Sequence, residues 1–322
     1  MPAPELTAPE MIAPRVAFGE TLVGLADRYP DLLLLDGDLA NSTRADILNG
    51  ARPDRFLEMG IAEQNMVGVA AGLATLGFVP WVSTFAAFLA SRSLDQIRVV
   101  VAQPNLNVKL AGGYSGLLTG STGKTHQEVA DLAIFRAMPN MTVIAPADAA
   151  EVRGAMHALM EHHGPAYLRL TRDPTPSITP RDRPFDIGRA YLLRDGPDLA
   201  LIATGTQTAR ALQAAELLAT EGIDASVLHV PTLKPLDVEA IVRVATRTGR
   251  VVTTEEHSII GGLGGAVAEV LAEHHPTPLR RHGLRDVFGE SGPNAALLEK
   301  YGFTPRHLAD FARDFVAAFI PV

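Results

Sequence analysis

The chain has 322 residues, of which 47% are hydrophobic and 20% are charged, and its formal net charge is −8. This length corresponds to roughly two domains of 100–200 residues, with enough apolar material for two buried cores. Arginines are scattered singly, so the sequence lacks the basic cluster that nucleic-acid binding requires. The absence of cysteine excludes disulfides, thiolate metal sites and cysteine nucleophiles.

Residues 1–12 are rich in Pro and Ala, with neither a basic start nor an apolar run. We expect a flexible tail there rather than a signal peptide. No stretch of the sequence approaches the ~20 apolar residues that span a membrane. We therefore expect no membrane contact and a cytoplasmic location.

Helical and strand patterns alternate over residues 13–172, which we expect to form one domain. Short continuous apolar runs are typical of strands that are covered on both faces. Such a run predicts a strand at residues 31–35, and further strands are expected at residues 55–59, 78–82, 107–110, 141–145 and 166–170. Helices are expected at residues 16–28, 63–76, 85–101 and 147–161. A glycine-rich loop covers residues 111–125.

A linker is predicted at residues 173–186, which carry four prolines and no apolar periodicity. Beyond it the alternation resumes in a second domain, residues 187–322. Its expected strands are residues 199–203, 225–230 and 251–254, and its expected helices are residues 206–221, 237–247 and 262–273. Strands that alternate with helices in this way predict an α/β fold class, with two doubly wound domains and mainly parallel sheets.

Two nucleotide-binding motifs are incomplete in this sequence. Gly123-Lys124-Thr125 would end a phosphate-binding P-loop only if a glycine stood at Leu118. The GGLGG run at residues 261–265 lacks the third glycine of a dinucleotide turn, because Val267 takes that place. We therefore set both nucleotide interpretations aside.

Three local patterns are informative in combination. GIAEQN at residues 60–65 follows a strand and opens a helix, STFAAF at residues 83–88 places two phenylalanines one helical turn apart, and THQ at residues 125–127 ends the glycine-rich loop. Each has an ordinary explanation alone, since an acidic residue in a first helical turn is favoured by the helix dipole and paired aromatics usually pack in a core.

In this order and spacing, with MPNMTVIAPAD at residues 138–148 and FGESGP at residues 288–293, the patterns resemble the pyrimidine-binding and C-terminal domains of transketolase. The resemblance covers about residues 13–322. It implies transfer of a two-carbon ketol unit from a ketose phosphate to an aldose or another aldehyde, with thiamine diphosphate as the cofactor.

The resemblance also implies roles at the cofactor. Glu63 would hydrogen-bond the far ring nitrogen of the aminopyrimidine and so promote its imino tautomer, and Phe85 and Phe88 would pack on that ring. Asp38 and Leu39 would lie near the cofactor. The third aromatic residue of the family is replaced by Ser91.

On the substrate side, the resemblance assigns the sugar phosphate to three residues: Arg15, Ser42 and Arg172. His126 would hydrogen-bond the sugar and help to move protons. Two substrate positions depart from the family, because Thr122 replaces an Asp and Tyr114 replaces a His. These changes put the usual sugar phosphates in doubt, so the substrate could carry a different anion such as a sulfonate.

The family's metal-binding segment, G-D-G followed by Asn, has no counterpart here beyond Gly37-Asp38-Leu39. The resemblance therefore implies no metal ligand on this chain. A separate N-terminal subunit would hold the diphosphate through Mg²⁺ or Ca²⁺, in an assembly of two copies of each subunit. We expect the C-terminal domain to serve mainly assembly and assign it no catalytic residue.

Two alternatives stay open. Deoxyxylulose-phosphate synthases and the beta subunits of 2-oxo acid dehydrogenases share the architecture, and the FGESG and THQ segments favour the former over the latter. A non-catalytic cofactor-binding or regulatory paralogue is the other alternative, and the retention of Glu63, Phe88 and His126 argues against it.

Overall fold

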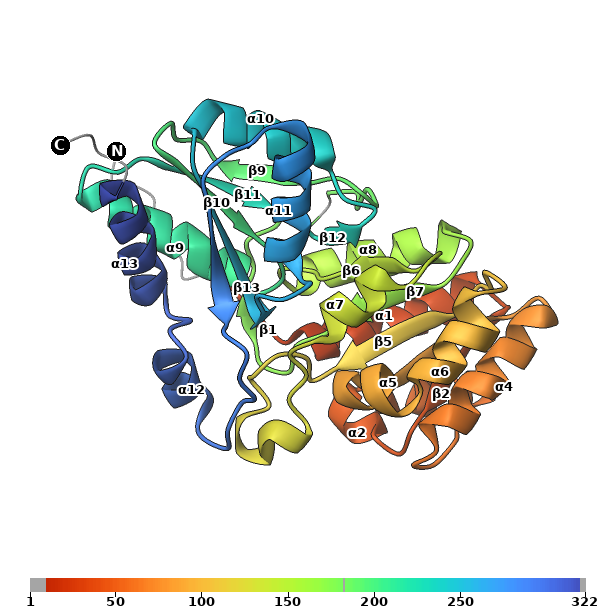
Figure 1. The fold of residues 1–322 in the computed structure, drawn as a ribbon. Coiled ribbons are helices and arrows are strands. Elements are labelled where there is room, and N and C mark those ends of the chain that lie inside the picture. Colours follow the sequence, from red (N-terminus) through yellow and green to blue (C-terminus); the bar gives the residue numbers. More distant parts are fainter. Residues whose placement is uncertain (1–9, 182, 319–322) are drawn as a thin grey trace, which may run out of the picture.

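The computed structural model describes residues 10–181 and 183–318, and within them the chain forms two α/β halves that pack side by side (Figure 1). The expected tail lies outside this range at residues 1–9. Its last residues were wrongly assigned, because β1 (Met11–Ile12) pairs antiparallel with β8 (Thr175–Pro176) inside the expected linker.

The first half is built on a sheet that has seven strands within the described residues, in the order β12-β6-β7-β5-β4-β2-β3, and only β12 runs antiparallel. The strands are β2 (Leu32–Asp36), β3 (Phe56–Glu58), β4 (Val79–Phe85), β5 (Lys109–Gly113), β6 (Thr142–Ile144), β7 (Ala166–Arg169) and β12 (Thr232–Lys234). The helices are α1 (Pro14–Arg28), α2 (Ala40–Thr43), α3 (Asp46–Ala51), α4 (Glu63–Thr75), α5 (Ala86–Arg92), α6 (Leu94–Gln96), α7 (Asp131–Ala137) and α8 (Ala149–Glu161). Shorter helical turns are η1 (Pro53–Arg55), η2 (Ile97–Ala102) and η3 (Gly120–Thr125).

Neighbouring side chains in the central strands point to opposite faces of this sheet, so they enter different cores. Leu34 and Trp81 pack in the core with α1 and α8. Leu35 and Val82, one residue further on, pack in the other core with α4, α5 and α7. Burial on both faces explains why these strands read as continuous apolar runs rather than alternating ones.

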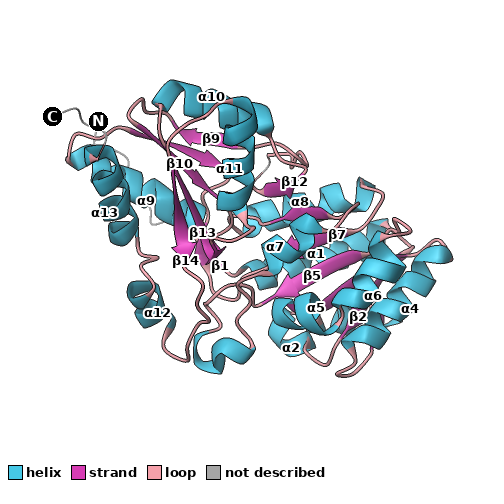
Figure 2. Cartoon of the chain, in the orientation of Figure 1, coloured by secondary structure: helices cyan, strands magenta, loops and turns pink. Residues whose placement is uncertain are grey.

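The second half repeats this arrangement on a sheet in the order β14-β13-β10-β11-β9, in which β9 alone of the described strands is antiparallel. Its strands are β9 (Tyr191–Arg194), β10 (Leu199–Ala203), β11 (Ala225–His229), β13 (Val251–Ser258) and β14 (Leu279–Leu284). Its helices are α9 (Gln207–Thr220), α10 (Val238–Thr248), α11 (Leu263–His274), α12 (Asn294–Lys300) and α13 (Pro305–Ala317). The prediction of two doubly wound, mainly parallel domains is confirmed (Figure 2).

The two halves share a core and a strand. β12 follows β11 in the sequence of the second half, but it pairs with β6 at the edge of the first sheet. Apolar residues of α10 and α11 join the core that also contains α4, α5 and α7. Sites at the boundary are therefore held by both halves.

One predicted helix is divided by a break. Residues 85–101 do not form a single helix, because Phe85 ends β4 and the helical path breaks at Ser93. The Ser93 hydroxyl donates to the carbonyl of Leu89, a local bond that competes with regular helix geometry. After the break, α6 passes into the π-helical turn η2. No helix within the described part of the chain has the length and apolarity to cross a membrane.

Candidate active site

The predicted site residues converge at one edge of the first sheet. β2, β4, β5 and β7 run parallel, so their carboxyl ends lie together, and ligands of α/β sheets bind beyond this edge. The segments that follow these strands carry most of the predicted side chains: Asp38, Leu39, Ser42, Phe85, Phe88, Tyr114 and Arg172. Glu63 follows β3 at the same edge.

Four rings from three segments form an aromatic cluster, which consists of Phe85, Phe88, Tyr114 and His126. Tyr114 stacks on Phe85 with ring centroids 4.1 Å apart, and Phe88 lies 5.6 Å from Phe85. The His126 ring stands edge-on to Phe85 at 5.8 Å and to Phe88 at 5.5 Å. The structure thus brings the predicted loop histidine onto the predicted cofactor aromatics.

Glu63 is the first residue of α4, and it is only 3% exposed. Its Oε1 accepts a hydrogen bond from Arg92 Nη1 at 3.0 Å, whereas no described residue donates to its Oε2. The carboxylate is thus joined to the cluster through Arg92, whose guanidinium carbon lies 3.9 Å from the centroid of the Phe88 ring. Flat apolar rings beside an acid with one unbonded oxygen fit an aminopyrimidine, which needs stacking partners and a carboxyl group at a ring nitrogen.

The Glu58 side chain holds the turn that precedes Glu63. Its Oε1 accepts from the backbone amides of Gly60 and Asp38, each at 2.9 Å. Both of these residues have positive φ angles, 69° for Gly60 and 61° for Asp38. One side chain therefore fixes the segments that follow β2 and β3. The Leu39 amide donates instead to the buried Asp36 at 2.7 Å, and burial raises the pKa of that carboxyl to about 6.

Two arginines meet at Tyr114. Arg15 Nη1 donates to the Tyr114 hydroxyl at 3.1 Å and to the carbonyl of Ser42 at 2.8 Å. The Arg172 guanidinium lies 5.6 Å from the Tyr114 ring centroid, and its Nη1 donates to Asp173 at 3.0 Å. Two converging guanidinium groups suit an anion that accepts several hydrogen bonds, such as a phosphate or a sulfonate. The Ser42 hydroxyl itself donates to Asn41.

The Thr122 hydroxyl bonds to Thr119 within the loop. The His126 Nδ1 is paired with the Thr125 hydroxyl at 2.8 Å. No hydrogen bond, ion pair or ring contact joins Thr122, Asp38 or Leu39 to the aromatic cluster among the described residues. Their predicted ligand roles stay predictions.

The C-terminal half reaches the site, although we expected it to serve mainly assembly. Asn294 Nδ2 donates to the carbonyl of Leu118 at 3.1 Å and also to Asp173, the partner of Arg172. Gln127 Nε2 donates to the carbonyl of Glu290 at 3.0 Å. A cavity of about 510 Å³ opens at this junction. Its lining residues come from both halves: Thr119, Ser121, Arg172, Ser291, Gly292, Pro293 and Asn294. Sequence reasoning missed this contact because its partners are far apart in the chain.

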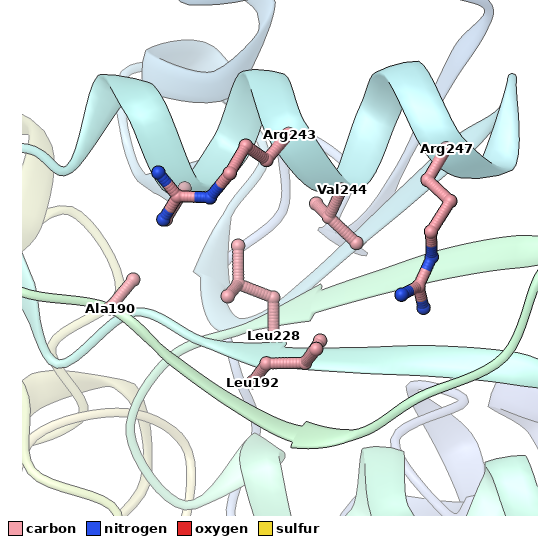
Figure 3. A pocket seen from close by; sticks show the side chains of 7 residues that line it. Ala190, Leu192, Leu228, Arg243, Val244 and Arg247 are labelled. Atoms are coloured by element: carbon pink, nitrogen blue, oxygen red, sulfur yellow. The ribbon is translucent and has the colours of Figure 1, made fainter.

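A separate pocket of about 320 Å³ lies in the C-terminal half, between α10 and strands β9 and β11 (Figure 3). Leu192, Leu228 and Val244 form its apolar lining, with Arg243 and Arg247 beside them. None of the predicted site residues lines it. We find no group of three or more His, Asp or Glu side chains in residues 10–181 and 183–318 that could hold a metal ion.

The fold and the site define the class of protein: two doubly wound domains that present a buried acid and aromatic rings at the carboxyl edge of the first sheet. Residues 10–177 match the transketolase pyrimidine-binding domain and residues 188–308 match the transketolase C-terminal domain. The chain therefore belongs to the transketolase family.

Relatives span this chain as separate subunits and as parts of longer proteins. The 6-deoxy-6-sulfo-D-fructose transketolase subunit SqwH of Clostridium sp. (strain MSTE9) is 44% identical over 301 residues, which cover 90% of this chain and 94% of that protein. A solved structure described as a split-gene transketolase in an inactive beta4 tetramer is 47% identical with a TM-score of 0.89, and covers 95% of this chain and 99% of its own. The 1-deoxy-D-xylulose-5-phosphate synthase of Synechococcus sp. (strain WH7803) is 36% identical over 303 residues, 93% of this chain but 46% of that protein.

Proposed function

We propose that this chain is the C-terminal subunit of a two-subunit transketolase, which transfers a two-carbon ketol unit from a ketose to an aldehyde acceptor. The observation that carries the proposal is the joining of the buried acid Glu63 to the aromatic cluster, beside the paired arginines at Tyr114. Thiamine diphosphate, when bound, supplies the acidic carbon on which ketol transfer depends.

Each side chain of this subunit has a distinct role at the cofactor or the substrate in this proposal. Phe85 and Phe88 hold the aminopyrimidine by stacking, and the Glu63 carboxyl bonds its ring nitrogen through the oxygen that is free of protein partners. His126, edge-on to both phenylalanines, hydrogen-bonds the sugar and moves protons at its hydroxyl groups. Arg15 and Arg172 hold the anion at the far end of the sugar.

The diphosphate and its Mg²⁺ or Ca²⁺ belong to a partner subunit in this proposal. The beta-type chain of the split-gene transketolase is described as inactive as a tetramer of its own kind, and the Clostridium relative is itself called a subunit. These descriptions support an N-terminal-type partner subunit. We propose that the active assembly contains two copies of that subunit and two of this chain. We propose a cytoplasmic location for it.

The anion of the substrate is the least constrained part of the proposal. Tyr114 contacts Arg15 through its hydroxyl and Arg172 through its ring, where the family has a histidine. One relative acts, by its name, on a sulfonated sugar. We therefore propose a terminal oxyanion, phosphate or sulfonate, as the class of substrate.

A reconstituted complex tests the proposal. This chain, an N-terminal-type transketolase subunit and the complex of the two would each be assayed for ketol transfer with thiamine diphosphate and Mg²⁺. Matched phosphorylated, sulfonated and uncharged sugars would serve as substrates. We expect transfer by the complex alone, with little turnover of the uncharged sugars. Transfer by the single chain would contradict the two-subunit proposal.

A deoxyxylulose-phosphate synthase-like reaction is the second candidate, because such a synthase aligns with nearly the whole chain. The same complex distinguishes the two candidates when it is given pyruvate and an aldose phosphate. Release of carbon dioxide without ketol transfer between sugars would favour the synthase reaction.

A further inference from the structure

Arg92 is the last residue of α5 and is tied to the start of α4 at two points. Its guanidinium donates to Glu63 Oε1 at 3.0 Å, and its backbone carbonyl accepts from Gln64 Nε2 at 2.9 Å. The guanidinium carbon also lies 3.9 Å from the centroid of the Phe88 ring. One residue thus contacts both the acid and the ring that the proposed function assigns to the cofactor.

The end of α5 explains why the side chain takes this direction. The helix stops at Arg92 because Ser93 leaves helical geometry, with φ −113° and ψ 12°, and bonds back to Leu89. Ser91, the residue before Arg92, is exposed and is too small to cover the phenylalanine rings. The ring face of Phe88 is therefore available, and the planar guanidinium of Arg92 stacks on it.

The environment of the pair is asymmetric. The Glu63 side chain is 4% exposed, whereas the Arg92 side chain is 48% exposed. Water screens the pair on the Arg92 side only, so removal of Arg92 would leave a buried carboxylate without its partner. The pair also has a geometric effect, since a bond to Oε1 restricts the rotation of the carboxylate and leaves Oε2 for a ligand.

We propose that Arg92 is a positioning residue, which holds Glu63 for the aminopyrimidine and supplies the third stacking layer that Ser91 cannot. The inference rests on the proposed function, because it concerns the same cofactor site. A lysine at this position would keep the charge but would lose the planar face and the fixed direction of its donors.

The test uses the reconstituted two-subunit complex. Arg92→Met removes both contacts, Arg92→Lys retains the charge, and Arg98→Met is the control, because Arg98 is exposed and pairs with Asp95 away from the site. The readouts are the thiamine diphosphate Kd from isothermal titration calorimetry, the KM of the sugar substrates, and the melting temperature.

We expect Arg92→Met to raise the cofactor Kd about tenfold, the effect of losing one charge-assisted contact. Arg92→Lys should recover part of this loss, and Arg98→Met should match the wild type. The sugar KM should stay unchanged in all three variants, whereas the melting temperature should fall in Arg92→Met alone, because only that change leaves the buried Glu63 carboxylate unpaired. In the double variant Arg92→Met/Glu63→Gln, the Kd should be close to that of Glu63→Gln, since Arg92 acts largely through the acid.

Unchanged or tighter cofactor binding by Arg92→Met would overturn the proposal, and tighter binding would identify Arg92 as a group that the cofactor must displace. An equal rise in the cofactor Kd of Arg98→Met, or a parallel rise in the sugar KM of Arg92→Met, would also overturn it, because the effect would then not be confined to the contact with Glu63. If the wild-type complex binds the cofactor without transferring ketol units, the proposed function fails while the binding data still decide the role of Arg92. A wild-type complex that binds no cofactor would overturn both.

Discussion

The buried ion pair between Asp131 and Arg169 lies in the first half of the chain, at its boundary with the second. Arg169 donates to the Asp131 carboxylate from Nε at 2.7 Å and from Nη2 at 3.1 Å. It also donates to the carbonyl of Glu256 on β13, across the boundary. Burial by itself would raise the pKa of the Asp131 carboxyl, but the Arg169 guanidinium, with smaller contributions from His257 and Tyr167, holds it below its usual range.

Asp131→Ala would leave the Arg169 guanidinium buried without its carboxylate. Removal of one partner from a buried pair costs about 3–5 kcal/mol. For a chain of this length, such a loss lowers the melting temperature by on the order of 5 °C. The exposed pair of Asp95 and Arg98 is the matched control, with N and O also 2.7 Å apart and side chains 71% and 63% exposed. Asp95→Ala should cost less than about 1 kcal/mol.

Urea unfolding at pH 7, followed by far-ultraviolet circular dichroism, measures both variants against the wild type. The double variant Asp131→Leu/Arg169→Met should recover much of the loss, because an apolar pair leaves no unpaired charge. Equal losses for Asp131→Ala and Asp95→Ala would refute the reasoning, since burial would then make no difference.

Three further predictions follow from single residues. Burial lowers the pKa of Lys109 to about 7 in the folded chain. Between pH 7 and 10 the unfolded chain therefore holds a proton on Lys109 that the folded chain has lost, so the free energy of unfolding should rise with pH over this range. Lys109→Met should reduce that rise by at most about 5 kcal/mol, as measured by urea midpoints at both pH values. Asn294→Ala removes the hydrogen bond to Asp173, the partner of Arg172, and should raise the KM of anionic sugars about threefold to tenfold with kcat retained in steady-state assays of the complex. An unchanged KM would show that this contact of the C-terminal half has no part in substrate binding. Tyr114→Phe removes the hydroxyl that accepts from Arg15 and should raise the same KM by a similar factor, and an equal effect on uncharged sugars would contradict that assignment.

Continuous apolar runs were sufficient to predict the central strands. Leu34 and Leu35 are both apolar because helices cover both faces of the sheet, and consecutive apolar residues of this kind can be recognised in the sequence. The helix expected at residues 85–101 is broken at Ser93, whose hydroxyl bonds back to Leu89, and apolar spacing carries no signal for such a break.

The candidate site residues were predicted from the resemblance to transketolase. The strand order accounts for the position of Phe85, Tyr114 and Arg172, since residues at the carboxyl ends of parallel strands meet at one edge of a sheet. Arg92 and Asn294 could not be placed in this way, because their contacts with Glu63 and Asp173 depend on a broken helix and on how the two halves pack. Long-range packing of this kind leaves no local pattern.

The central claim is that this chain activates thiamine diphosphate through Glu63, within a two-subunit enzyme. Hydrogen–deuterium exchange at the acidic carbon of the cofactor measures that activation directly, before any sugar binds. Glu63→Gln keeps the shape of the side chain and removes the acid, and Glu269→Gln, at an exposed carboxylate that pairs with Arg136, is the control. We predict exchange slowed by at least about 100-fold in Glu63→Gln and unchanged in Glu269→Gln, both in the reconstituted complex. Exchange at the wild-type rate in a Glu63→Gln complex that still binds the cofactor would contradict the claim.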